Sequence, residues 1–244
     1  MIAVIAPEQA SAAANDFDLP GGQRSTRLTL IRHGQTAWNQ DGRIQGHIDI
    51  ALNAHGLRQA QAMAQALADE ADIACIYSSD LARAWQTAQA LQARLGKPLQ
   101  AEEGLRERCF GQLQGLSVAQ ICAQDPQRAR AFQSRAPDYQ PPQGESLRQF
   151  AQRAWACVAR LAAAHAGQHI ALVTHGGVLD ALYRQATGLD LQAARSWSIE
   201  NTSIHRLLWT PQGLRLLAWG DVAHLDELPA PQPGPQAAST QHFV

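Results

Sequence analysis

The chain has 244 residues, a length that fits one large α/β domain with extensions at its ends better than two full domains. Hydrophobic residues make up 45% and charged residues 17%, which is typical of a packed globular protein and excludes a disordered, collagen-like or coiled-coil chain. The formal net charge of -1 provides no uniform basic field for nucleic acid, so any recognition of a charged ligand must be local.

The four cysteines lie far apart without a C-x-x-C pair, which favours a reducing compartment over a disulfide framework. The apolar start of the chain ends after six residues at Pro7 and has no basic flank, so it is too short for a signal-peptide core or a membrane span. We therefore expect a cytoplasmic protein whose partners include neither a membrane nor a nucleic acid.

Short apolar runs at residues 28–31, 73–77, 170–173 and 204–209 predict strands, the third of them a buried parallel one. Amphipathic stretches alternate with these runs, which indicates a three-layer α/β/α sandwich around a central, mostly parallel sheet. Residues 1–25 and the Pro/Gln-rich residues 222–244 show no periodicity, so we expect disordered extensions there and one folded domain at residues 26–221.

Three helices are predicted from apolar spacing and caps. The first runs from about residue 53 to 69 with Leu57 on its apolar side, and the second follows an Asp80 cap up to residue 95. The third covers residues 146–165 and opens with the capping-box pattern of Ser146 and Gln149. Residues 104–144 are rich in Gly and Pro, so we expect an excursion above the sheet there rather than a second domain.

Two of the predicted strands end in a histidine followed by glycine. Residues 32–36 read Arg-His-Gly-Gln-Thr, and residues 174–177 read Thr-His-Gly-Gly. Open α/β sheets bind ligands beyond the carboxyl ends of their strands, so the repeated pattern favours a site role for His33 and His175 over a structural one. Glycine lets backbone N–H groups approach an anion closely, and the helix after Gly177 would point its positive end at that anion.

Two further residues are candidates, each with an ordinary alternative. Arg83 lies in a first helical turn off the apolar stripe, as a solvated surface arginine also would. Glu107 lies between two arginines in the loop-rich excursion, where a surface ion pair is the usual explanation. Together with Arg32 and the two histidines, however, they provide what phosphoryl transfer needs: a neutral imidazole nucleophile, guanidinium groups for the phosphate oxygens and an acid for the leaving oxygen.

At this point the residues resemble a known family. Residues 32–36 with Asn39, the run Ser-Ser-Asp-Leu-x-Arg-Ala-x-Gln-Thr-Ala at residues 78–88, and residues 174–177 look like the histidine phosphatase superfamily, in its phosphoglycerate-mutase-like branch. The resemblance covers about residues 27–220. It implies a phosphorylated His33, with Glu107 as proton donor and then base. The catalytic residues that it implies are Arg32, His33, Arg83, Glu107 and His175. The substrate-binding residues that it implies are Arg32, Gly34, Gln35, Thr36, Asn39, Gln45, Gly46, Arg83, Glu107 and Gly176.

Details of the sequence favour hydrolysis over mutase activity. Residues 107–115 are similar to the Glu-Arg-His-Tyr-Gly-x-Leu-Gln-Gly run of cofactor-dependent phosphoglycerate mutases, but Cys109 and Phe110 replace the His and the Tyr. Only 27 residues separate Leu116 from Gly144, where the mutases have a longer segment, and Gly177 stands where they have Asn. A short lid leaves the phosphoenzyme open to water.

We therefore expect a histidine acid phosphatase-type phosphomonoester hydrolase that acts on a small phosphorylated metabolite. The alternatives are a cofactor-dependent phosphoglycerate mutase and a noncatalytic phospholigand-binding protein. Binding alone does not require a proton donor, so Glu107 disfavours the second.

No cofactor and no metal are expected. The sequence has no Walker-A, dinucleotide-binding or His-Glu-x-x-His pattern, and the arginines beside the strand ends would repel a cation from His33 and His175. Arg128, Arg130 and Arg135 lie in the predicted lid, either as solvated helix residues or as ligands for a second acidic group of the substrate. A homodimer is compatible with the sequence.

Overall fold

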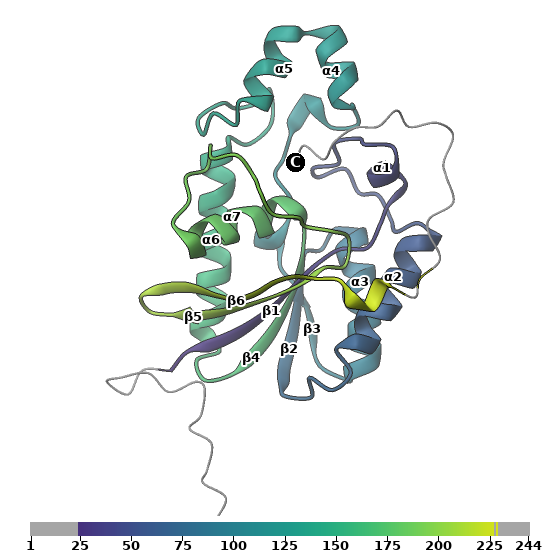
Figure 1. Cartoon of the computed structure of the whole chain (residues 1–244), viewed down its shortest axis with the longest axis vertical. Coiled ribbons are helices and arrows are strands. Elements are labelled where there is room, and N and C mark those ends of the chain that lie inside the picture. Colours follow the sequence, from purple (N-terminus) through teal and green to yellow (C-terminus); the bar gives the residue numbers. More distant parts are fainter. Residues whose placement is uncertain (1–23, 227, 229–244) are drawn as a thin grey trace, which may run out of the picture.

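A six-stranded sheet forms the centre of the part of the chain that the computed structural model describes, residues 24–226 and 228. Its strands are β1 (Thr26–Arg32), β2 (Ile73–Ser78), β3 (Leu99–Ala101), β4 (His169–Thr174), β5 (Ile204–Thr210) and β6 (Gly213–Asp221). Their order in the sheet is β3-β2-β4-β1-β5-β6 (Figure 1). The first four are mutually parallel, and β5 and β6 are added in antiparallel pairings.

Helices cover both faces of this sheet. The α-helices of the described residues are α1 (Ala37–Gln40), α2 (Ala54–Ala66), α3 (Ala82–Leu95), α4 (Val118–Gln124), α5 (Pro126–Gln133), α6 (Leu147–Ala164) and α7 (Gly176–Thr187). Helices α2 and α3 lie on one face, and α6 and α7 lie on the other (Figure 1). Alternate residues of β1 enter the two cores, since Leu30 packs with α6 and α7 while Ile31 packs with α2 and α3. The predicted three-layer α/β/α architecture is thus confirmed.

The strands expected at the four apolar runs are all present. Strands β3 and β6 are not predicted from the sequence, because β3 has only three residues and β6 lacks a regular alternation of buried and exposed residues. The third predicted helix begins as expected, since Ser146 and Gln149 form a complete capping box at the start of α6. Leu57 is 46% exposed, however, so its predicted place on the core side of α2 is wrong.

The cap predicted for α3 is also wrong. The N-cap position is Leu81, which makes no side-chain cap bond, and the Asp80 carboxylate instead pairs with Arg106. Asp49 supplies the missing acceptor from another loop, since the backbone N–H of Ala82 donates to its Oδ1 at 2.7 Å. A residue 33 positions upstream therefore satisfies one of the first N–H groups of the helix.

The excursion between β3 and α6 forms a lid at one end of the sheet. It contains the 3₁₀ helices η1 (Glu103–Leu105) and η2 (Gly111–Leu113), followed by α4 and α5, which stand above the rest of the fold in Figure 1. A small core of its own holds the lid together, with Leu113, Ile121 and Ala129 packed on Ile44 and Phe110. The lid contacts the rest of the fold through Ile44, which belongs to the loop after α1.

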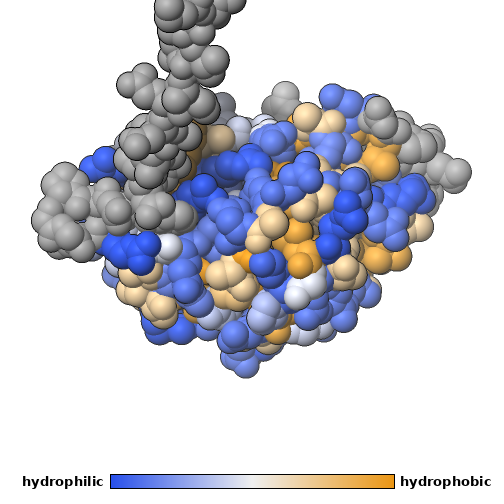
Figure 2. All heavy atoms as spheres, turned by 90° about the horizontal axis from the view of Figure 1, so that it is seen from below, coloured by the Kyte–Doolittle hydropathy of each residue, from blue (hydrophilic) through white to orange (hydrophobic). Residues whose placement is uncertain are grey.

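Most of residues 1–25 and 222–244, for which disordered extensions are predicted, lies outside the described residues. The described part of the second extension contains a 3₁₀ helix, η3 (Ala223–Leu225). Seen from below, the surface is mainly hydrophilic with small interspersed hydrophobic areas (Figure 2). In the described part of the chain no helix is both long and apolar enough to cross a membrane.

Candidate active site

The two predicted histidines meet because their strands are neighbours. β1 and β4 are parallel and adjacent, with Arg32 paired to Thr174 in the register, so the residue after each strand emerges at the same edge. The backbone N–H of His33 donates to the carbonyl oxygen of Thr174 at 2.9 Å. The centroids of the imidazole rings of His33 and His175 are 5.1 Å apart. Residues 142 positions apart in the chain thereby share one site.

The His33 imidazole is held with one ring nitrogen available. Its Nδ1–H donates to the carbonyl oxygen of Gly34 at 2.7 Å, which leaves the lone pair on Nε2. The side chain is buried, and this burial, together with the positive charges of Arg83 and Arg32, lowers the pKa of His33 well below its usual value. The ring is therefore neutral at physiological pH, which is the form that can attack phosphorus.

Two guanidinium groups lie beside these rings. Arg83 reaches the site from α3 and is fully buried, so the surface alternative for this residue is wrong. Its terminal nitrogens donate to the carbonyl oxygens of Gly46 at 2.7 Å and Ile48 at 3.1 Å, which fixes the plane of the guanidinium. Burial lowers the pKa of Arg83 to about 10 and that of Arg32 to about 10, so both remain positively charged at neutral pH.

Three buried nitrogen atoms at this point have no hydrogen-bond partner: Nε of Arg32, Nε of Arg83 and Nδ1 of His175. Buried donors are nearly always satisfied in folded proteins, so three orphaned ones around a single spot indicate an anionic ligand. The fit to a phosphate group is good, because its oxygens accept several hydrogen bonds and its charge offsets the two guanidiniums.

The proton of His175 is directed by Ser79. The ring Nε2 lies 2.9 Å from the Ser79 Oγ, which already accepts a bond from the backbone N–H of Leu81 at 3.3 Å. This arrangement favours a Ser79 hydroxyl that donates to Nε2, which leaves the proton on the orphaned Nδ1. Burial and the charge of Arg83 lower the pKa of His175 well below its usual value, so the ring acts as a neutral donor.

Glu107 is the acidic group of the site, and its carboxylate is held from two sides. Its Oε1 accepts from the backbone N–H of Arg108 at 2.8 Å, and its Oε2 accepts from the backbone N–H of Gly177 at 3.0 Å. A Cβ atom at position 177 would lie 2.1 Å from Oε1. The second glycine of the Thr-His-Gly-Gly pattern is therefore required for the carboxylate to lie where it does.

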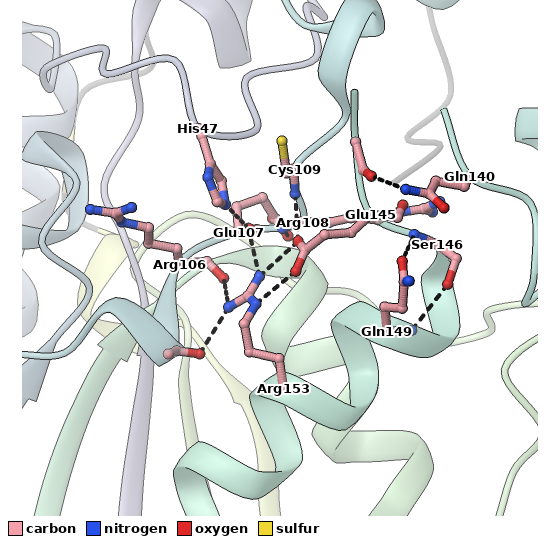
Figure 3. A network of polar contacts seen from close by, with 12 residues as sticks. His47, Arg106, Glu107, Arg108, Cys109, Gln140, Glu145, Ser146, Gln149 and Arg153 are labelled. Carbon is pink, nitrogen blue, oxygen red and sulfur yellow. Dashed lines mark hydrogen bonds and ion pairs between the residues drawn. The ribbon is translucent and has the colours of Figure 1, made fainter. Parts of the chain in front are cut away.

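The backbone of Glu107 is held in turn by a network that Figure 3 shows. Arg153 of α6 donates to the carbonyl oxygens of Gly104, Arg106 and Glu107 at 3.0–3.1 Å and pairs with both carboxylate oxygens of Glu145. The Nε2–H of His47 donates to the same Glu107 carbonyl oxygen at 2.8 Å. A partly exposed guanidinium thus fixes the loop that carries the carboxylate through five hydrogen bonds, which holds the acid in one place.

A cavity of about 420 Å³ opens at this cluster. It is lined by eight of the predicted substrate-binding and catalytic residues: Arg32, His33, Asn39, Gln45, Gly46, Arg83, Glu107 and Gly176. Phe110 and Phe132 contribute from the lid, so the excursion covers the site.

Four of the predicted site residues do not line this cavity: His175, whose fully buried ring has its centroid 5.1 Å from that of His33, and Gly34, Gln35 and Thr36. The backbone N–H of Gly34 donates to Thr87, and that of Gln35 donates to Gln59. Thr36 caps α1. These backbone groups of Gly34 and Gln35 and the side chain of Thr36 are engaged within the protein, and contact of the three residues with substrate stays a prediction.

The comparisons with known proteins agree with this geometry. The family model described as "Histidine phosphatase superfamily (branch 1)" matches residues 28–222. The chain belongs to this superfamily. It is 40% identical over 208 residues to phosphoglycerate mutase-like protein 4 of Arabidopsis thaliana, an alignment that covers 82% of this chain and 87% of the relative. It is 38% identical over 205 residues to the metal-independent phosphoserine phosphatase of the same plant, with 83% and 84% covered.

A solved structure of similar fold is that of a mycobacterial glucosyl-3-phosphoglycerate phosphatase in complex with VO3. It superposes with a TM-score of 0.71 at 33% identity and covers 80% of this chain and 99% of its own.

Some residues of this histidine phosphatase were not predicted from the sequence. The segment from Arg195 to Glu200 forms one wall of the cavity, and the amide nitrogen of Asn201 donates to the carbonyl oxygen of His33 at 2.9 Å. These residues belong to a stretch without regular secondary structure and carry no motif. Ser79 could have been found, because it immediately follows β2, the strand beside β4. Within residues 24–226 and 228, no group of three or more His, Cys, Asp or Glu side chains is placed to hold a metal ion.

Proposed function

We propose that this protein hydrolyses phosphomonoesters of small metabolites through a phosphohistidine on His33. The observation that carries the proposal is the set of three orphaned donors on Arg32, Arg83 and His175 beside a neutral imidazole. These donors suit a phosphoryl group in the transition state of transfer, which is stabilised mainly by neutralisation of its charge and by fixed hydrogen-bond donors.

In the first step, the Nε2 lone pair of His33 attacks phosphorus while the bond from phosphorus to the ester oxygen breaks. Glu107, in its protonated form, gives its proton to that oxygen, and the alcohol leaves. The guanidiniums of Arg32 and Arg83 and the Nδ1–H of His175 bind the oxygens of the transferred group. The first turn of α7 adds its positive end at Gly176, which lines the cavity.

In the second step, water attacks the phosphorus of the phosphohistidine. The Glu107 carboxylate left by the first step takes a proton from this water, and the bond from phosphorus to Nε2 breaks. Inorganic phosphate leaves, with His33 neutral and Glu107 protonated again. Glu107 donates a proton in the first step and accepts one in the second, so its rigid placement by Arg153 and Gly177 serves both steps.

Hydrolysis is favoured over mutase activity by the lid. A mutase must keep water from its phosphoenzyme and retain a phosphorylated intermediate. Here the lid over the cavity consists of two short helices of seven and eight residues, α4 and α5. The phosphatase names of one Arabidopsis relative and of the mycobacterial structure support the same choice.

The proposed location is the cytoplasm. All four cysteines belong to the described residues and are free thiols, and Cys75 and Cys157 are buried. Free thiols are typical of a reducing compartment.

The proposed function is tested with a panel of phosphomonoesters and the variant His33→Ala. We expect phosphate release by the wild type, loss of at least about 1,000-fold of kcat in the variant with an unchanged circular dichroism spectrum, and a labelled phosphohistidine after acid-free quenching. Full activity of His33→Ala would exclude this mechanism. An assay of 3-phosphoglycerate with 2,3-bisphosphoglycerate covers the mutase alternative, for which isomerisation faster than phosphate release would be decisive.

A further inference from the structure

A second cavity, of about 390 Å³, adjoins the catalytic one. Glu107, Phe110, Phe132 and Arg195 line both, so the two meet at the proposed proton donor. We call this second cavity the side chamber. Because Glu107 protonates the leaving oxygen, a space that opens on Glu107 away from the histidines lies where the body of the leaving alcohol must go. The inference rests on the proposed function and concerns the substrate that this site takes.

The exposed area of the side-chamber walls is mainly apolar, although eight of the sixteen lining residues are polar or charged. Phe110 and Phe132 meet edge to face with ring centroids 5.8 Å apart, and Phe150 of α6 adds a third ring. Leu147 and Leu191 complete the apolar part of the lining. The apolar part of this surface binds a ring or a hydrocarbon chain by burial.

Among the polar residues of this lining, Asp180 has a buried oxygen atom without a donor. The Asp180 side chain is only 6% exposed, and its Oδ2 accepts from Arg135 at 2.7 Å and from Arg184 at 2.9 Å. Its Oδ1 is buried and has no hydrogen-bond partner, and Nη2 of Arg184 is likewise buried without one. Arg135 lies beyond the last residue of α5, with its Nε on the carbonyl oxygen of Leu191 and its Nη2 on Asp180, so the alternative of a solvated helix residue is wrong. A carboxylate oxygen without a donor is costly, which marks Oδ1 as the acceptor for a ligand.

Asp180 lies close to the residue that holds the proposed proton donor, Glu107. It follows Gly177 by three residues on α7, and the backbone N–H of Gly177 binds the Glu107 carboxylate. Helical rise places the two residues about 4.5 Å apart along the helix axis, on the same face. A donor two or three bonds from the ester oxygen of a substrate can therefore reach Asp180 while Glu107 protonates that oxygen.

We propose that the side chamber is the leaving-group subsite, and that it takes the phosphate ester of an arylalkyl alcohol with a hydroxyl group next to the ester carbon, which donates to Asp180 Oδ1. The donor is a neutral hydroxyl rather than an ammonium, because Arg108, Arg135 and Arg195 line the same space and would repel a cation. The three rings hold the aryl group.

Two synthetic esters test this assignment: 2-hydroxy-3-phenylpropyl phosphate and its 2-methoxy analogue. The methoxy group keeps an acceptor but removes the donor. For the wild type we expect kcat/KM for the hydroxyl ester to be about ten-fold or more above that for the methoxy ester, since hydrogen bonds to charged groups are among the strong ones.

The matched variant is Asp180→Asn, which conserves the shape of the side chain. Its amide oxygen would turn to the donors Arg135 and Arg184, so the amide N–H₂ would replace Oδ1. We expect the preference for the hydroxyl ester to fall to two-fold or less, while the bulk of the methoxy group acts equally in both proteins. The control is Asp138→Asn, which removes the charge of an exposed ion pair with Arg148 and should keep the wild-type preference.

The outcomes are distinct. An equal preference in the wild type and Asp180→Asn overturns the subsite, as does a lack of preference in the wild type. Cleavage of 4-nitrophenyl phosphate without cleavage of either arylalkyl ester also overturns the subsite but leaves the proposed function standing. Failure to cleave any phosphomonoester overturns the proposed function and the subsite together.

Discussion

A single methyl group at position 177 should separate acid catalysis from the rest of the mechanism. In Gly177→Ala the new Cβ would lie 2.1 Å from Oε1 and 3.0 Å from Cδ of Glu107. Carbon atoms do not approach an oxygen this closely, so the carboxylate must leave its place and lose the bonds from the N–H groups of Gly177 and Arg108. The groups that bind phosphate, Arg32 and Arg83, have no part in this contact.

The magnitude follows from what Glu107 contributes. A positioned general acid accelerates a reaction by about 10²–10⁴-fold, so kcat for an alkyl phosphate should fall about 100-fold or more. The nitrophenolate ion leaves without a proton, so kcat for 4-nitrophenyl phosphate should change by less than about five-fold. Each of the two lost hydrogen bonds to the carboxylate lowers the free energy of unfolding by about 1.5–3 kcal/mol. Replacing Gly by Ala in a helix restores up to about 1 kcal/mol of it, so we expect the variant to fold.

The assay is the ratio of kcat values for the alkyl and the nitrophenyl ester in wild type, Gly177→Ala and Gly176→Ala. Gly176 is the matched control for this ratio: a Cβ there would have its nearest contact at 3.7 Å, with Nε of Arg32, and any effect on phosphate binding would act on both esters equally. We expect the ratio to collapse in Gly177→Ala and to stay at the wild-type value in Gly176→Ala. Equal losses on both esters in Gly177→Ala would refute the reasoning, because the glycine would then serve phosphate binding or folding instead.

Three further predictions address the acid, the metal and the stability. Glu107→Gln should lower kcat for alkyl phosphates about 100-fold or more and spare 4-nitrophenyl phosphate; a uniform loss would remove Glu107 from proton donation. Exhaustive chelation should leave hydrolysis unchanged, and a strict metal requirement in the same assay would contradict the mechanism. Burial and the charge of Arg27 lower the pKa of His169 to about 4, so the unfolded chain binds the extra proton between pH 6.5 and 4 and stability falls as pH drops through that window. The free energy of unfolding, measured with urea at pH 7 and at pH 5, should fall between these pH values by about 2 kcal/mol more in the wild type than in His169→Gln. The same fall in both proteins would exclude His169 as its source.

The strands and the first residues of the site were predictable from the sequence. The apolar runs have the length and composition of buried strands, and the histidines follow them directly, so placing His33 and His175 at one edge required only that the strands be parallel. The capping box of Ser146 likewise lies within four consecutive residues. In each case the determining interaction is local.

The burial of Arg83 and the cap of α3 were not predictable in this way. Arg83 lies off the apolar stripe of its helix, and only the carbonyl oxygens of Gly46 and Ile48, from a loop more than thirty residues upstream, make a buried position tolerable. Asp49 of the same loop caps the helix in place of Asp80. A pattern within one helix carries no information about which loop closes over it.

The sequence by itself determined four of the six strands, three of the longer helices, the superfamily, and the residue types of the phosphate site, because periodicity, caps and motifs act over a few neighbouring positions. Only the tertiary structure decided how the acid is held and what the substrate meets beyond the phosphate. Glu107 depends on Arg153 and Gly177, which lie 46 and 70 residues away, and the side chamber depends on Asp180 with its partners Arg135 and Arg184. Contacts at such separations arise from the packing of the lid on α6 and α7, and the chain fixes that packing only when the whole core forms.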